Sequence, residues 1–169
     1  MKGIAAQVFA PNANMTRGQL VTVLYRLAGE PETQNTYPFT DVSQTSYCAK
    51  AVAWAYENGL TKGVTGTQFA PNHPVTREQM VTFFARYALY MGEEVTGEGD
   101  LSAFTAGNQV SPYARTAMAW AVETGLIKGM GNHTVSPKGM ATRAQTAAIL
   151  MRYCKIFWFN EKTCVIYIL

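Results

Sequence analysis

The chain has 169 residues, of which 48% are hydrophobic and 15% charged, a balance typical of a globular domain with a real core. Its formal net charge of +3 excludes a polybasic nucleic-acid-binding protein, and no apolar stretch reaches the roughly 18 residues of a membrane span. Cys48, Cys154 and Cys164 contain no C-x-x-C pair, so we expect no disulfide framework, zinc site or cofactor.

The first predicted helix covers residues 16–28. Thr16 is a favourable N-cap, and Gln19 three residues later completes a capping box. Apolar residues then recur at helical spacing until Gly29, which is expected to end the helix. Upstream, Phe9 is expected to pack into the core from a loop.

Two kinds of helix alternate in the rest of the chain. Residues 47–58 and 113–123 are rich in alanine, which predicts helices that pack closely. Residues 76–91 and 142–153 instead resemble the first helix, with a Thr N-cap and a Gln three residues on. Residues 154–169 hold two short apolar runs that match nothing else; they predict either a small hairpin over the core or a divergent tail without a role.

A block of residues occurs three times in strict register. Each Thr-Arg-x-Gln follows a Gly by 13 positions and a Pro by 5, and a further Arg comes 10 positions after each Thr. The three blocks are Thr16-Arg17-Gly18-Gln19, Thr76-Arg77-Glu78-Gln79 and Thr142-Arg143-Ala144-Gln145. Three ungapped copies indicate a triplicated structural unit.

Capping explains the Thr and the Gln of this block, but not the Arg. The start of a helix is positive by its dipole, so a cation there is mildly unfavourable. We interpret the repeated Arg as part of an anion site, in which backbone N–H groups, the dipole and a guanidinium converge. The alternative is an internal ion pair with an acid such as Asp41, Glu57 or Glu123.

Other candidate residues give weaker signals. His73 and His133 do not occupy equivalent positions and have no partner at metal-ligand spacing, so we expect both on surface loops. Trp54 and Trp120 are expected in the core, with a sugar-stacking platform as the alternative. No phosphate loop, nucleophile motif or carboxylate pair stands out, so we predict that the chain is not an enzyme.

The ordered set of motifs resembles the S-layer homology domain. The resemblance covers about residues 1–153 and is clearest in the second copy. Its motifs there are Phe39-Thr40-Asp41-Val42, Tyr47-x-Ala49, Ala53-Trp54-Ala55, Gly59 and Gly63, Phe69-x-Pro71, and Thr76-Arg77-Glu78-Gln79. The family signature is Thr-Arg-Ala-Glu, and all three copies here end in Gln instead.

This resemblance implies an all-α fold, in which helix-loop-helix repeats form a pseudo-threefold bundle. It also implies a non-catalytic module of the bacterial cell wall, whose grooves bind anionic, often pyruvylated, secondary polysaccharide attached to peptidoglycan. Carried over by position, the implied ligand-binding residues are Arg17, Arg77, Arg143, Asp41, Tyr47, Gly3, Gly63 and Gly129. The alternatives are a protein-interaction module of a surface layer, or the anchoring end of a larger secreted enzyme.

The copies are expected to be unequal. We place half of repeat 1 in residues 1–31, repeat 2 in 39–92, repeat 3 in 101–153 and the tail in 154–169. Repeat 1 lacks its leading helix, so we expect that the sequence is truncated and that any export signal would lie in the missing part. In repeat 3, alanine replaces the Asp of the second copy. The site around Arg77 is therefore expected to be the most complete.

Overall fold

The computed structural model describes residues 9–157, and it is all-α, as predicted. Within that range the backbone forms isolated bridges but no named strand. The five α-helices are α1 (Arg17–Leu27), α2 (Ala49–Glu57), α3 (Arg77–Tyr90), α4 (Arg115–Glu123) and α5 (Arg143–Phe157). Three short 3₁₀ turns are η1 (Gly107–Gln109), η2 (Pro112–Ala114) and η3 (Gly131–His133). No helix in the described range is both long enough and apolar enough to cross a membrane.

The three helices that follow a Thr-Arg-x-Gln block begin with the predicted capping box. In α1 and α3, the Thr hydroxyl accepts from the Gln backbone N–H, while the Gln side chain accepts from the Thr backbone N–H. Thr142 and Gln145 exchange the same two hydrogen bonds at the start of α5. Local sequence therefore determines where these helices begin.

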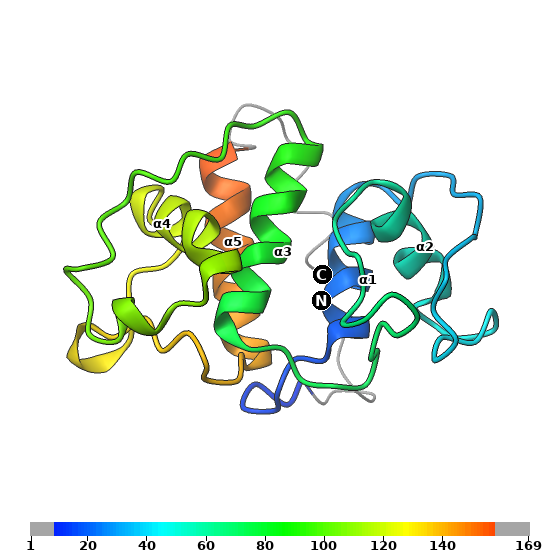
Figure 1. Cartoon of the computed structure of the whole chain (residues 1–169), viewed down its shortest axis with the longest axis horizontal. Coiled ribbons are helices and arrows are strands. Elements are labelled where there is room, and N and C mark those ends of the chain that lie inside the picture. The colour runs from blue at the N-terminus through cyan, green and yellow to red at the C-terminus, as the bar shows by residue number, and fades with distance from the viewer. Residues whose placement is uncertain (1–8, 158–169) are drawn as a thin grey trace.

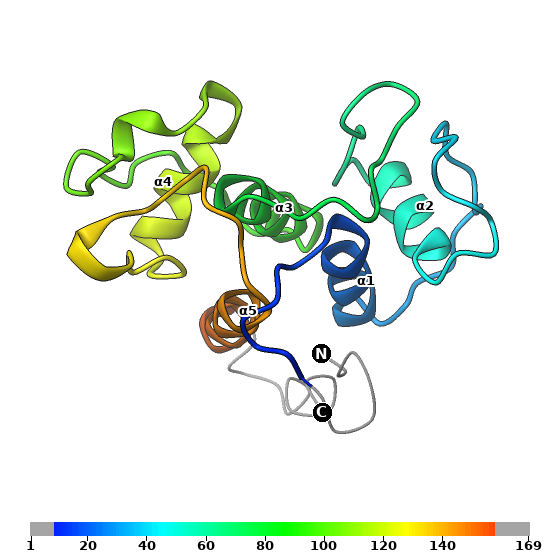
Figure 2. The same ribbon diagram turned by 90° about the horizontal axis from the view of Figure 1, so that it is seen from below.

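These capped helices form the centre of the molecule. Figure 2 shows α1, α3 and α5 arranged around one axis, with α2 and α4 outside them. The segments before the three helices join in a closed ring of backbone hydrogen bonds. Met15 N–H donates to Ala141 O at 2.8 Å, Ala141 N–H to Val75 O at 2.9 Å, and Val75 N–H to Met15 O at 2.9 Å. This ring gives the predicted pseudo-threefold arrangement a physical basis.

The alanine-rich helices cover the outside of this bundle. α2 packs on α1 and α4 packs on α3, so the two pairs lie at opposite ends of the molecule (Figure 1). Each outer helix buries its tryptophan, because Trp54 and Trp120 are both 1% exposed. Both are core residues, and neither offers a face to a sugar, so the stacking-platform alternative is wrong.

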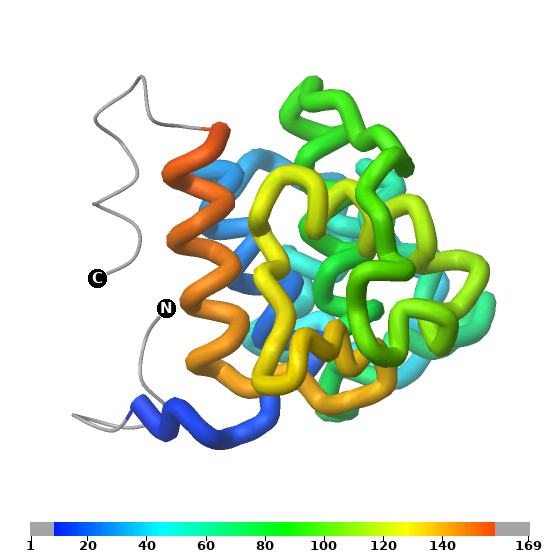
Figure 3. Tube along the Cα trace, turned by 90° about the vertical axis from the view of Figure 1, so that its left-hand side faces the viewer, coloured from blue at the N-terminus to red at the C-terminus, as the bar shows by residue number. Residues whose placement is uncertain are grey.

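Helix α5 runs four residues beyond the end expected from the sequence, and Figure 3 shows its full length. The extension packs on the core, because the Phe157 ring lies 4.8 Å from Tyr153 and 5.9 Å from Trp120. Residues 154–157 are thus helical, and the rest of the segment for which a hairpin or a divergent tail was considered lies outside the described range. Phe9 differs from its expected burial, since it is 38% exposed whereas its counterpart Phe69 is fully buried.

Candidate ligand-binding pocket

The repeated arginines are buried side chains that clamp a neighbouring loop. Arg17, Arg77 and Arg143 are 6%, 4% and 4% exposed. Their Nε groups donate to backbone carbonyls far away in the sequence, Arg17 to Phe69 at 2.7 Å, Arg77 to Val135 at 2.9 Å and Arg143 to Phe9 at 2.9 Å. For Arg17 and Arg77 the hydrogen bond goes to a loop carbonyl, not to any of the three acids considered above.

The N–H groups at the helix starts are used inside the protein. In α1, Arg17 N–H donates to His73 O at 2.9 Å and Gly18 N–H to Pro71 O at 2.8 Å. The third N–H group, of Gln19, is bonded to Thr16. Helices α3 and α5 repeat the pattern. The expectation that these N–H groups face an anion is therefore wrong, and only the guanidinium remains for that purpose.

Arg17 lies over two aromatic rings in its clamp. Its guanidinium carbon is 4.8 Å from the Phe69 ring centre and 5.4 Å from that of Phe83. Burial lowers the pKa of Arg17 to about 10, against the opposing influence of Tyr113 and Asp41, so the side chain remains charged at neutral pH.

Asp41 supports this clamp from behind. Its carboxylate accepts hydrogen bonds from Phe69 N–H at 2.9 Å and Ala70 N–H at 2.7 Å. Ala70 has a φ of 59°, a left-handed conformation that costs a non-glycine residue roughly 1–2 kcal/mol. Asp41 therefore stabilises the strained loop whose carbonyl Arg17 binds. It does not line the pocket.

A pocket of about 370 Å³ opens beside Arg17. It lies between α1, the loop after α2, α3 and the segment that precedes α4. Its lining includes Arg17, Gly63, Gln79, Phe83, Arg86 and Tyr113. Two guanidinium groups thus face one pocket whose lining, among the residues that the structure describes, contains no carboxylate. Such a pocket favours an anionic group.

Arg86 is held in place by its own backbone contact. Its Nη1 donates to Leu60 O at 3.0 Å, and the equivalent Arg152 donates to Leu126 O at 2.9 Å. These bonds fix each side chain at the end of an outer helix. The second charge of the pocket is therefore positioned before any ligand arrives.

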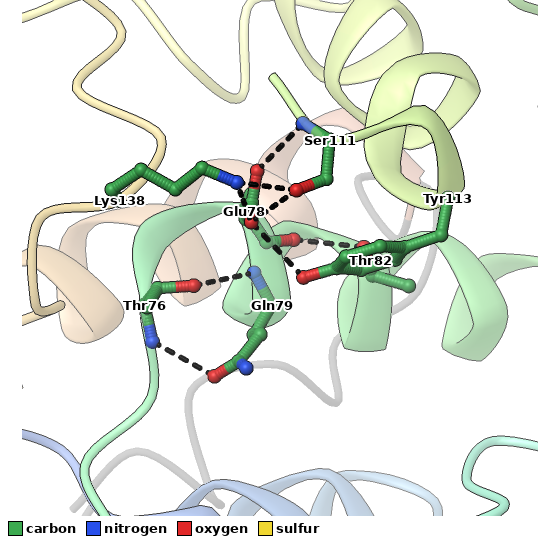
Figure 4. A network of polar contacts seen from close by, with 7 residues as sticks. All are labelled: Thr76, Glu78, Gln79, Thr82, Ser111, Tyr113 and Lys138. Atoms are coloured by element: carbon green, nitrogen blue, oxygen red, sulfur yellow. Dashed lines mark hydrogen bonds and ion pairs between the residues drawn. The ribbon is translucent and has the colours of Figure 1, made fainter. Parts of the chain in front are cut away.

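Tyr113 also lines the pocket and is 55% exposed. Its hydroxyl donates to Glu78 Oε1 at 3.2 Å, within the network shown in Figure 4. Burial and the adjacent Glu78 carboxylate raise the pKa of Tyr113 to about 12. The phenol is neutral at physiological pH, and its ring offers an apolar face beside two cations.

Gly63 contributes a wall of bare backbone. Its φ is 83°, and a Cβ there would come within 2.5 Å of Phe39 and of two carbonyl oxygens. Only glycine fits at this position. Gly129 also has a positive φ, at 78°, and the Phe104 ring approaches it. Gly3, the third predicted member, lies outside the described residues.

The structure redistributes the predicted site residues. It brings Arg17 and Gly63 together, with Asp41 behind them, although the sequence favoured Arg77 as the centre of the fullest site. Tyr47 belongs elsewhere, because its hydroxyl lies 2.8 Å from where a Cβ on Gly18 would be. The surroundings of Arg77 match those of Arg17, because Arg77 bonds the Val135 carbonyl and lies near a second arginine, Arg152.

Four residues of this region were absent from the predicted site. Arg86 recurs 10 positions after each Thr, and Tyr113 lies 66 positions after Tyr47, so repeat position was a usable signal for both. No signal pointed to Glu78 and Lys138, because they are 60 positions apart and the other two blocks have glycine and alanine in place of Glu78.

Comparison with known proteins agrees with this architecture. The family model described as "S-layer homology domain" matches residues 1–21, 38–81 and 104–147. Arg17, Gly63 and Tyr113 fall in the first, second and third of these matches, so the pocket is built from all three.

Individual relatives differ widely in their names. A surface-layer 125 kDa protein of Lysinibacillus sphaericus is 33% identical over 90% of this chain, which spans 13% of that protein. An endoglucanase of Bacillus sp. (strain KSM-635) is 31% identical over 88% of this chain and is spanned for 16% of its length. A cellulosome-anchoring protein of Acetivibrio thermocellus is 25% identical over 90% of this chain and is spanned for 34%.

The shared stretch is thus a small part of larger proteins with unlike names. More than half of this chain matches the family model, in three segments. The chain belongs to the S-layer homology domain family, whose domain serves as a cell-surface anchoring module.

Proposed function

We propose that this chain attaches a larger protein to the bacterial cell wall by binding a carboxylate-bearing polysaccharide in the Arg17 pocket. The observation that carries the proposal is the pairing of two guanidinium groups, from Arg17 and Arg86, with the exposed ring of Tyr113. Cations beside an aromatic face suit an acidic sugar, because one part binds the carboxylate and the other packs on the sugar ring.

The pocket supplies these contacts at low cost in ordering. Arg17 is fixed by Phe69 O, and Arg86 by Leu60 O. Both side chains have therefore lost their rotamer freedom before binding, and this preorganisation favours affinity. A ketal-linked pyruvate fits the proposal, since it places a carboxylate rigidly on a sugar ring. The ligand class is thus an anionic wall polysaccharide, of which pyruvylated polymers are the expected source.

The relatives' names support anchoring as the role of the shared stretch. The names of a surface-layer protein, a cellulosome-anchoring protein and an endoglucanase have little in common, and the first two name a surface layer or an anchoring role. We propose that this chain is likewise a non-catalytic module, and that the protein that carries it is displayed on the wall. Any activity of that larger protein belongs to other segments.

Sedimentation with purified cell walls tests this function. The chain is expected to sediment with intact walls and to stay in solution with walls stripped of secondary polysaccharide. Tyr113→Ala should weaken sedimentation, whereas Leu89→Ala, which truncates another exposed side chain away from the pocket, should leave it unchanged. Equal binding to stripped walls would overturn the proposal and favour a protein or peptidoglycan partner.

A further inference from the structure

We propose that Glu78 is a positioning residue that holds the Tyr113 ring against the pocket. This inference rests on the proposed function, because it assigns Tyr113 a role in ligand binding. Glu78 is the third residue of the second Thr-Arg-x-Gln block, where the other copies have Gly18 and Ala144. A carboxylate at this point is therefore found only in the second of the three copies.

The Glu78 carboxylate is buried and fully engaged. Its side chain is 5% exposed and accepts hydrogen bonds from Ser111 N–H and Ser111 Oγ, both at 3.0 Å. Lys138 Nζ approaches Oε1 at 2.8 Å and also bonds the Ser111 hydroxyl. The Tyr113 hydroxyl completes the set, as Figure 4 shows. Burial alone would raise the pKa of Glu78, but hydrogen bonds from Lys138 and Ser111 outweigh it and lower the pKa.

Tyr113 is the member of this network that needs an anchor. More than half of its surface is exposed, and it lies in a short 3₁₀ turn outside any long helix. A tyrosine in such a place is free to leave the pocket by rotating about χ1 unless something holds it. The buried carboxylate fixes the hydroxyl end, so the ring face stays beside Arg17 and Arg86.

Tyr47, which precedes α2 as Tyr113 precedes α4, is positioned in a different way. Tyr47 packs directly against Gly18, where even a Cβ would come within 2.8 Å of its hydroxyl. Gly18 leaves room for the Tyr47 side chain, whereas the Glu78 carboxylate binds the Tyr113 hydroxyl. Gly18 and Glu78 occupy the same position of the repeated block, which indicates that the placement of this tyrosine matters.

The alternative is that Glu78 only ties α3 to two neighbouring segments, the one before α4 through Ser111 and the loop before α5 through Lys138. Lys138 distinguishes the two roles, because Lys138→Met removes the ion pair and leaves the Tyr113–Glu78 hydrogen bond in place. A structural tie would be damaged by either substitution. If Glu78 positions Tyr113, then Glu78→Ala and Tyr113→Phe should weaken ligand binding, whereas Lys138→Met should leave it unchanged.

The first measurement needs no ligand. The pKa of Tyr113 is followed by NMR of chain labelled at the tyrosine ring carbons, assigned by comparison with Tyr113→Phe. It should lie near 12 in the parent chain, fall in Glu78→Ala and stay raised in Lys138→Met. An unchanged pKa in Glu78→Ala would overturn the inference, whether or not the chain binds cell walls.

The second measurement uses calorimetric binding of a synthetic hexoside that carries a ketal-linked pyruvate. Glu78→Ala and Tyr113→Phe should each weaken binding about twofold to tenfold, the cost of ordering one side chain. The double variant should be no weaker than Glu78→Ala, since both remove one interaction. Additive losses, or an equal loss in Lys138→Met, would overturn the positioning role. Failure of the parent chain to bind would instead refute the proposed function.

Discussion

Arg17→Ala would remove the buried side chain that joins α1 to the loop containing Phe69. The sequence pattern alone predicts that alanine at the three block arginines abolishes binding and leaves the fold intact. In the structure, Arg17 is buried, bonds the Phe69 carbonyl at 2.7 Å and stacks on two phenylalanine rings. We therefore predict that Arg17→Ala destabilises the chain as well as weakening binding.

The size of this effect follows from the interactions that the Arg17 side chain makes. A hydrogen bond from a charged donor to a carbonyl contributes about 1.5–3 kcal/mol. The stacking on Phe69 and Phe83 adds roughly 0.5–2 kcal/mol. Relief from burying the charge offsets part of the sum, so we expect Arg17→Ala to lower the unfolding free energy by about 3 kcal/mol. For a chain of this size that lowers Tm by roughly 6–12 °C.

Thermal and urea unfolding followed by circular dichroism measure this destabilisation. Arg115→Ala is the matched control, because Arg115 begins α4 on the exposed surface, and its Tm should change little. If Arg17→Ala unfolds within about 2 °C of the parent chain, the clamp contributes little. Arg17 would then contribute to ligand binding and not to the stability of the fold.

Two further predictions concern backbone strain and acid. Ala106 has a φ of 65°, so Ala106→Gly should relieve backbone strain and raise Tm by about 2–4 °C. The control Ala148→Gly, inside α5, should lower Tm by a similar amount. A fall in Tm for both variants would refute the strain at Ala106. The Glu78 pKa is lower in the folded chain than in the unfolded one, so the network stabilises the fold fully above about pH 5, and its contribution is lost as the pH falls through the folded pKa. The difference in unfolding free energy between the parent chain and Glu78→Gln should accordingly be constant from about pH 5 to 8 and shrink below about pH 4, and a difference that persists at low pH would contradict this account of Glu78.

Features that depend on local sequence were predictable. The capping boxes, the glycines that end helices and the alanine-rich outer helices all follow from residues close in the chain. The repeat register indicated a triplicated unit, and the resemblance to a known family, not the register itself, implied the pseudo-threefold bundle. His73 and His133 are exposed, as expected from their lack of partners.

Contacts between repeats could not be read in the same way. The carbonyl that accepts from Arg17 lies 52 positions away, and the loop carbonyls that use the helix N–H groups are similarly remote. A pattern of residue types shows that an arginine recurs, but not that its Nε is already occupied. For the same reason the sequence assigned the fullest site to Arg77, whereas Gly63 and Tyr113 gather around Arg17.

The most direct test of the central claim is calorimetric titration of the chain with two hexosides that differ only in a ketal-linked pyruvate. The two guanidinium groups of the Arg17 pocket predict that the pyruvylated sugar binds and that the sugar without pyruvate does not bind measurably. Binding of the pyruvylated sugar should also weaken as salt is raised, since the attraction is between charges. Equal affinity for the two sugars would contradict recognition of an anionic polysaccharide by this pocket.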